Sequence, residues 1–496
     1  MHLSALLDFD AVPRDTDDAV SVLVDLTAPE REEDTGRPPA TLQVVLDRSG
    51  SMGGGRLDGA VRALLSLVER LAPSDNFGLV SFNNQARVEV PCGPLEDKAR
   101  VRRLISGLHA SGGTDLSSGL LRGVQETRRA GADRGGTLLL ISDGHANQGV
   151  TDHDLLRQVA ADAYSHGVTT TTLGYGLGYD EELLGAVADG GAGSALFAED
   201  PDTAGGLIAQ EAEYLLAKTA QAVSLRVPSG PPLRSVSVVG EMPSHQLADG
   251  SVVVELGDFH SGERRRLLLR LEVRGLSAPG TVAALEVAYA DPTTLDTRTV
   301  SLSVELDVVA RDAAEERVPR PEVRAEEVLQ RAQTAKRRAS EAMRRGDRFG
   351  AAGLLEEART DLADHMPAAP AGAGGAGAAA APPEVLAQME ELRRMAGMTR
   401  TGDTSRVSKS LYASQAGYSR KSGRQRPVTA QDGGERAGGD GKQAERDRTG
   451  GSGTRDGASG HGQGSGRGRR GRLIRGQQTD GGRPTPDEGA PPPREA

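Results

Sequence analysis

Residues 44–53 read VVLDRSGSMG. An apolar run ends at one carboxylate, Asp47, and two hydroxyls follow at alternate positions, Ser49 and Ser51. The run has the composition of a strand buried on both faces, and the glycines after it permit a tight loop. We therefore expect three oxygen-bearing side chains to leave the end of a central strand together.

Around this stretch, from residue 41 to about 219, continuous apolar segments alternate with segments of helical periodicity. This alternation is typical of a doubly wound, mainly parallel α/β sheet with helices on both faces. Segments 76–82 and 86–92 are close enough to form a hairpin, which adds one antiparallel strand. In such folds the functional loops lie at the carboxyl ends of the strands.

Two further segments place oxygen ligands at the same edge of the expected sheet. SGGTDLSSG, residues 111–119, opens a helix with Thr114, and LLLISDG, residues 138–144, ends a buried strand at Asp143. Hydroxyl and carboxylate oxygens select a hard cation, with Mg²⁺ first and Mn²⁺ or Ca²⁺ as alternatives. The sequence therefore predicts a divalent metal site at this edge.

The composition of this oxygen set also indicates what the site would do. Neutral hydroxyls in direct contact with a cation leave its charge under-compensated, whereas carboxylates one shell further out hold its waters and offset the charge only in part. Such a cation stays electrophilic at an open position, and the carboxylate of a partner protein is the obvious additional ligand.

The segments DRSGS, GGT and ISDG together resemble the von Willebrand factor type A (VWA) domain and its metal-ion-dependent adhesion site (MIDAS) over about residues 39–219. The resemblance implies that Ser49, Ser51 and Thr114 contact the metal and that Asp47 and Asp143 act through water. It also implies a bacterial cytoplasmic protein with a flanking β-sandwich, whose partner is an AAA+ ATPase or a signalling kinase.

Outside this region the periodicity changes. Helical patterns vanish after about residue 221, and six alternating segments indicate an antiparallel sandwich, which the lone early strand at 18–27 joins. Two helical patterns follow around Gly346. The expected organisation is an N-terminal strand segment (1–38), the VWA domain (39–219), the β-sandwich (220–311), a helical hairpin (320–366), an Ala/Gly/Pro linker (367–383), a short helix (384–398) and a disordered basic Gly/Arg-rich tail (399–496).

The charge of the chain is unevenly distributed. From Arg400 to the end there are 19 Lys and Arg against 11 Asp and Glu, a net of +8, while the whole chain carries −11, which leaves −19 on the rest. The tail has no hydrophobic period, so we expect it to stay disordered. Its lack of interleaved aromatic residues argues against nucleic-acid binding.

Cys92 is the only cysteine, so no disulfide can form within the chain, and this suits a reducing compartment. The N-terminus lacks the basic start and apolar core of a signal peptide. No apolar run reaches the ~20 residues of a membrane helix. We expect a cytoplasmic protein without a membrane segment.

The preferred hypothesis is thus a non-enzymatic interaction module that captures a partner Asp or Glu through the metal. One alternative is a metal-assisted hydrolase or phosphatase, since Mg²⁺ can activate water, although no general base stands out in the sequence. Another is a scaffold that works through its helices and tail while the metal site is vestigial.

Overall fold

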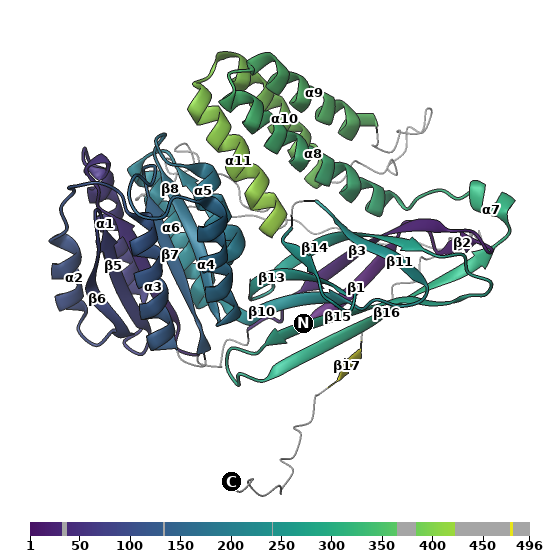
Figure 1. Ribbon diagram of the computed structural model, residues 1–496, viewed down its shortest axis with the longest axis horizontal. Coiled ribbons are helices and arrows are strands. Elements are labelled where there is room, and N and C mark those ends of the chain that lie inside the picture. The colour runs from purple at the N-terminus through teal and green to yellow at the C-terminus, as the bar shows by residue number, and fades with distance from the viewer. Residues whose placement is uncertain (32–36, 132–133, 241, 365–382, 422–476, 480–496) are drawn as a thin grey trace, which may run out of the picture.

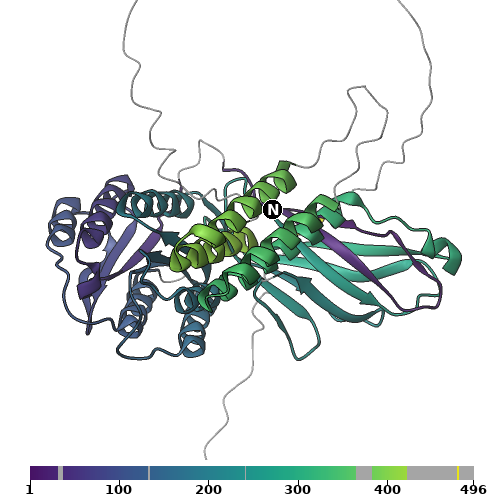
Figure 2. The same cartoon turned by 90° about the horizontal axis from the view of Figure 1, so that it is seen from above.

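The computed structural model describes residues 1–31, 37–131, 134–240, 242–364, 383–421 and 477–479. An α/β domain and a pair of packed β-sheets lie side by side, and a group of helices sits above the junction between them (Figure 1). Seen from above, these helices cross from one body to the other (Figure 2).

The α/β domain is built on a six-stranded sheet in the order β6-β5-β4-β7-β8-β9, in which only the β5–β6 pair is antiparallel. Buried apolar clusters fill both faces of the sheet. The expected doubly wound, mainly parallel sheet is confirmed. Its strands are β4 (Thr41–Asp47), β5 (Asn76–Phe82), β6 (Ala86–Pro94), β7 (Gly136–Ser142), β8 (Val168–Tyr175) and β9 (Ala192–Ala198). Its helices are α1 (Arg56–Arg70), α2 (Lys98–Ser106), α3 (Leu116–Gly131), α4 (His153–Ser165), α5 (Glu181–Gly190) and α6 (Pro201–Leu216).

Helix α3 lies unusually close to the sheet because two of its inward positions are glycines. A Cβ atom built on Gly123 would lie 2.3 Å from Cγ2 of Val45, and one on Gly119 would lie 2.6 Å from Cδ1 of Phe82. Only glycine permits this approach. The close packing fixes the start of α3, and with it Thr114, relative to the end of β4.

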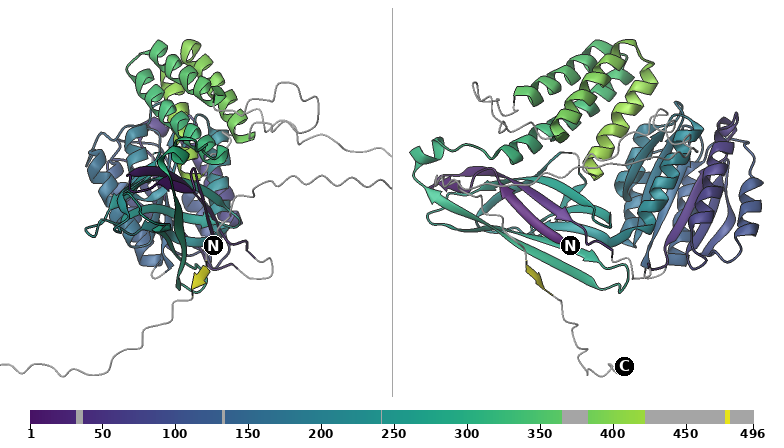
Figure 3. Two further views of the ribbon diagram at one scale, coloured as in Figure 1. Left: turned by 90° about the vertical axis from the view of Figure 1, so that its right-hand side faces the viewer. Right: turned by 180° about the vertical axis from the view of Figure 1, so that it is seen from behind.

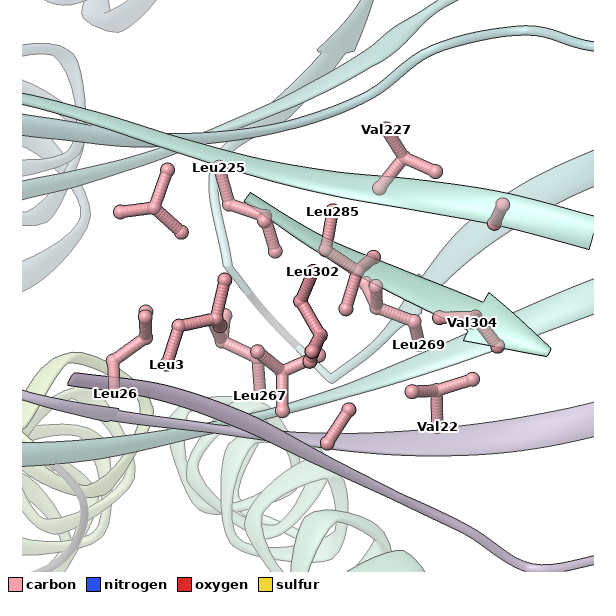
Figure 4. Close-up of a cluster of buried hydrophobic side chains, with 14 of the residues drawn as sticks. Leu3, Val22, Leu26, Leu225, Val227, Leu267, Leu269, Leu285, Leu302 and Val304 are labelled. Carbon is pink, nitrogen blue, oxygen red and sulfur yellow. The ribbon is translucent and has the colours of Figure 1, made fainter. Parts of the chain in front are cut away.

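The second body consists of two sheets that enclose one apolar core (Figure 4). All their strand pairs are antiparallel except one short parallel pair, residues 11–13 with 307–309. One sheet has the order β1-β3-β14-β11, so the strand expected at 18–27 pairs with strands on both sides of it. The α/β domain is therefore inserted between strands of the sandwich. The strands are β1 (His2–Leu7), β2 (Ala11–Pro13), β3 (Asp18–Thr27), β10 (Lys218–Val227), β11 (Leu233–Val239), β12 (Ser244–Gln246), β13 (Val252–His260), β14 (Arg264–Val273), β15 (Gly280–Ala290), β16 (Thr297–Val309) and β17 (Gln477–Thr479); a short helix, α7 (Arg311–Glu315), follows β16.

The third body is a group of four helices with its own apolar core. They are α8 (Pro321–Arg344), α9 (Arg348–Asp364), α10 (Pro383–Thr401) and α11 (Thr404–Lys421). The view from behind shows α11 reaching from this group down to the α/β domain (Figure 3).

The expectation of disorder throughout 399–496 is wrong, because 399–401 belong to α10, 404–421 form α11 and 477–479 form β17. Asp403 caps α11 by accepting a hydrogen bond from the backbone N–H of Arg406, and Val407 and Leu411 are buried in the helical core. Residues 422–476 and 480–496 of the expected tail and residues 367–382 of the expected linker lie outside the described residues.

Candidate metal centre

The structure brings all five predicted residues, Asp47, Ser49, Ser51, Thr114 and Asp143, to the carboxyl edge of the α/β sheet. Asp47 ends β4, Asp143 directly follows β7, and Thr114 lies two residues before α3. Ser49 and Ser51 belong to the connection between β4 and α1, where Gly50–Met52 form a short 3-10 helix. Parallel strands end at one edge, so residues distant in sequence meet there.

A chain of hydrogen bonds joins four of these residues. Oδ1 of Asp47 accepts a bond of 2.7 Å from the backbone N–H of Ser49. The hydroxyl oxygens of Ser49 and Ser51 are 3.0 Å apart, and the Ser51 hydroxyl donates to Oδ1 of Asp143 at 2.7 Å. The two serine hydroxyls therefore lie between the two carboxylates.

The Thr114 hydroxyl lies near the Ser51 hydroxyl, with Gly144 next to both. A Cβ atom built on Gly144 would lie 3.4 Å from the Ser51 hydroxyl oxygen and 3.8 Å from that of Thr114. The backbone N–H of Thr114 donates to Oδ1 of Asn147, which fixes the threonine. The absence of a side chain at Gly144 thus leaves a small space between two hydroxyls.

The two carboxylates and two of the three hydroxyl residues, Ser49 and Thr114, are buried in the domain, and Ser51 reaches the surface. Asp47 is 0% exposed and Asp143 1% exposed, whereas Ser51 is exposed. Burial raises the pKa of Asp47, the neighbouring Asp143 raises it further, and hydrogen bonds from Ser142 and Ser49 act in the opposite direction. The site therefore places buried negative charge beside one exposed hydroxyl, Ser51, through which a cation could be reached from outside.

Arg56, which the sequence analysis did not single out, also belongs to this site. Its Nη1 lies 2.7 Å from Oδ2 of Asp143 and donates to the backbone carbonyl of Ser51. The signal available in the sequence was its position, the first residue of a helix directly after a glycine loop. Ser142 was also missed; its hydroxyl donates to Oδ2 of Asp47 at 2.7 Å.

These residues fit a hard divalent cation. Two carboxylates converge on the site, and within the described chain Arg56 is the one cation that forms an ion pair with either of them, so negative charge remains to be balanced. The donors are all oxygen, which suits Mg²⁺. The described residues contain no group of three or more His, Cys, Asp or Glu side chains that could hold a metal, so a cation here would depend on the hydroxyls.

Replacing Arg56 with Met should strengthen Mn²⁺ binding about fivefold, because it removes a like charge worth roughly 1 kcal/mol at such a partly exposed position. Isothermal titration of the purified protein measures this. Arg70→Met is the matched control, since it removes the same charge from the far end of α1. Unchanged or weaker Mn²⁺ binding in Arg56→Met would contradict the expectation.

Comparisons with known proteins agree with this fold. The family model for the von Willebrand factor type A domain matches residues 42–210. An uncharacterized protein of Synechocystis sp. is 28% identical over 345 residues, which are 67% of this chain and 80% of that protein. The uncharacterized protein YfbK of Escherichia coli is 27% identical over 262 residues, 51% of this chain and 45% of that protein.

A solved structure, described as von Willebrand factor type A from Catenulispora acidiphila, superposes with a TM-score of 0.65 at 15% sequence identity. The superposition covers 84% of this chain and 96% of that one, so the likeness of fold extends well beyond the α/β domain. Residues 42–210 of this chain therefore form a von Willebrand factor type A domain.

Proposed function

We propose that the protein is a metal-dependent interaction module without enzymatic activity. Ser49, Ser51 and Thr114 would hold a divalent cation, Mg²⁺ first and Mn²⁺ or Ca²⁺ as alternatives, in the manner of a MIDAS, with Asp47 and Asp143 one shell further out. The bound cation would supply an electrophilic position for an Asp or Glu of a partner protein. VWA domains are in general protein-interaction modules.

The observation that supports the proposal most directly is the burial of the two carboxylates beside hydroxyl groups, one of which is exposed. Both carboxylates are buried and their oxygens already accept hydrogen bonds from Ser49, Ser142, Ser51 and Arg56. Each carboxylate is thus held in place by donors, and Ser51 is the one exposed residue of the three that carry hydroxyls. This favours capture of a ligand over hydrolysis.

The resemblance to bacterial proteins of this kind suggests an AAA+ ATPase or a signalling kinase as the partner that presents the acidic residue. We also propose a cytoplasmic location, since the single thiol, Cys92, is buried and forms no disulfide. Among the helices that the structure describes, none has the length and apolar character required to span a bilayer.

Removal of divalent cation should abolish recognition of acidic ligands. The test displays random peptides with one fixed Asp, and the same library with Asn instead, against the immobilised full-length protein. We expect enrichment from the Asp library in Mg²⁺, none in EDTA, and none from the Asn library.

The matched variants are Ser49→Ala with Ser51→Ala, which should lose the enrichment, and Ser118→Ala, which removes a hydroxyl that only bonds the backbone of Asp115 and should keep it. Enrichment that survives EDTA and the double substitution would refute the metal-mediated contact. Turnover of p-nitrophenyl phosphate with Mg²⁺ or Mn²⁺ would instead support a phosphatase.

A further inference from the structure

Helix α11 is attached to the VWA domain by a buried ion pair. Nζ of Lys409 lies 2.5 Å from Oε2 of Glu181, and both residues are less than 10% exposed. The same ammonium group donates to the backbone carbonyl of Tyr179 at 2.6 Å and lies 4.2 Å from the centre of the Tyr179 ring. One cation from the helical domain thus fixes the carboxylate, the backbone and the ring of residues just before and at the start of α5.

Other contacts complete this junction. The Ser408 hydroxyl donates to Oε1 of Glu181, so both oxygens of that carboxylate are bound by α11. A Cβ atom built on Gly185 would lie 1.8 Å from the hydroxyl oxygen of Tyr412, which shows that the tyrosine packs directly on the backbone of α5. At the margin, Arg406 pairs with Glu199 at 2.5 Å with both side chains well exposed.

Residues 176–180 connect β8 to α5, and we call them the β8–α5 loop. Besides contacting α11, this loop contacts the candidate metal centre. A Cβ atom on Gly178 would lie 3.2 Å from the backbone carbonyl oxygen of Asp143. One on Gly176 would lie 3.1–3.3 Å from the guanidinium of Arg56, the cation that pairs with Asp143. The same five residues therefore contact α11 and the metal centre.

Tyr179 limits how this loop can move. Its side chain is 3% exposed, and a Cβ atom on Gly174 would lie 2.2–2.4 Å from its ring atoms. The centre of its ring lies 5.6 Å from that of Phe197. The ring is therefore enclosed by β8 and β9 and capped by Lys409, so α11 supplies one wall of its site.

We propose that α11, through Lys409, holds the β8–α5 loop in the conformation that supports the metal centre. Lys409 is then a positioning residue for a site it does not touch. Docking of α11 and binding of the cation favour one another, because coupling between two sites is reciprocal. A partner that draws α11 away would weaken the metal centre. The coupling to metal rests on the proposed function, whereas the coupling of α11 to the loop does not.

The first measurement is hydrogen exchange on the full-length protein without divalent cation, comparing wild type with Lys409→Met. We expect exchange at residues 176–180 and 143–149 to become at least about tenfold faster, within the range of ordinary coupling between sites. Arg406→Met is the matched control, since it also removes an α11 cation that pairs with a VWA glutamate, but the pair is exposed and its glutamate, Glu199, is not part of the loop. In this variant the exchange of residues 176–180 and 143–149 should stay within about twofold of wild type. Faster exchange confined to α11 in Lys409→Met would overturn the proposal.

The second measurement is Mn²⁺ titration of the same proteins. Lys409→Met should bind Mn²⁺ about tenfold more weakly than wild type, and Arg406→Met should match wild type. Equal affinity in Lys409→Met would overturn the proposal while leaving the proposed function intact. If wild type takes up no Mn²⁺, the proposed function fails, and the exchange data still decide whether α11 controls the loop.

A third measurement does not depend on the folding of any variant. Saturating wild type with Mn²⁺ should slow hydrogen exchange within residues 404–418 of α11, because the reciprocal effect must appear at the distant helix. Unchanged exchange in α11 on metal saturation would contradict the coupling.

Discussion

Asp47→Asn should weaken Mg²⁺ binding by about 10- to 100-fold, the usual effect of losing an outer-shell partner of a metal. In the absence of metal the same substitution should raise the melting temperature. The amide fits the site: its oxygen can accept from the Ser49 N–H, and its NH₂ can donate to the Ser142 hydroxyl, which can accept as well as donate. The opposed effects on metal affinity and stability follow from the same buried charge.

The sign of the stability effect comes from the pKa of Asp47. Burial is the main cause that raises this pKa, and the nearby Asp143 raises it further. The ionised form of Asp47 therefore destabilises the fold at neutral pH. A neutral isostere removes this effect, and relief of about 1 kcal/mol corresponds to an increase of about 2–4 °C in a domain of this size. Calorimetric melting with and without Mg²⁺ measures both parts.

Asp75→Asn provides the contrast, because Asp75 is equally buried but ion-paired with Arg37 at 2.5 Å. Burial acts to raise the pKa of Asp75, but the bonds from Arg37, Ala40 and Ala72 outweigh it and lower the pKa. The ionised form therefore contributes stability above the ordinary aspartate pKa, and this is lost as pH falls through the lowered value. Asp75→Asn should lower the melting temperature and leave Mg²⁺ affinity unchanged. A metal-free Asp47→Asn protein that also melts lower would contradict our account.

Lys336→Ala should destabilise the helical domain by about 3–5 kcal/mol, the usual cost of removing one partner from a buried ion pair. Lys336 is 0% exposed, and its Nζ lies 2.8 Å from Oε2 of Glu391, 2.8 Å from Oε1 of Gln388 and 3.0 Å from Oγ of Ser414. It joins α8 to both α10 and α11. Its loss leaves the largely buried Glu391 carboxylate without the ammonium group that pairs with it.

Replacing both partners, Lys336→Met with Glu391→Leu, should restore most of the stability, because a well-packed apolar pair avoids the cost of burying charge. Arg359→Ala on α9 is the control; its pairing with Glu356 is solvent-exposed, and its loss should cost less than about 1 kcal/mol. Denaturant unfolding followed by hydrogen exchange over residues 321–421 gives the values. A double variant as unstable as Lys336→Ala would show that the polar network itself is required.

The α/β fold and the candidate site were accessible from sequence because both follow from local patterns. Continuous apolar strands such as 41–47 indicate a parallel sheet, and parallel strands bring their carboxyl ends to one edge. Asp47, Thr114 and Asp143 each follow or precede such an element, so their convergence needs no long-range information. Arg56 was not predicted as a site residue because its long side chain reaches back over its own loop, and the sequence does not show the direction of a side chain.

Helix α11 was missed because its composition is that of a solvated segment. Ser408, Lys409 and Gln415 are buried, and their burial is compensated by groups elsewhere, such as Glu181. A short stretch of sequence shows that these side chains are polar and costly to bury, but it does not show the distant partner that compensates for their burial. The same holds for Lys336, which has the polarity of a surface residue and lies in the core.

The insertion of the VWA domain within the sandwich has a consequence for synthesis of the chain. Thr27 of β3 pairs with Arg264 of β14. At ordinary elongation rates β14 leaves the ribosome roughly 10–50 s after β3, so β3 cannot form this pairing during that time. During that interval the VWA domain can fold by itself, while β3 stays without its second neighbour. The nascent protein therefore passes through a stage in which an apolar strand is available to chaperones and to other nascent chains.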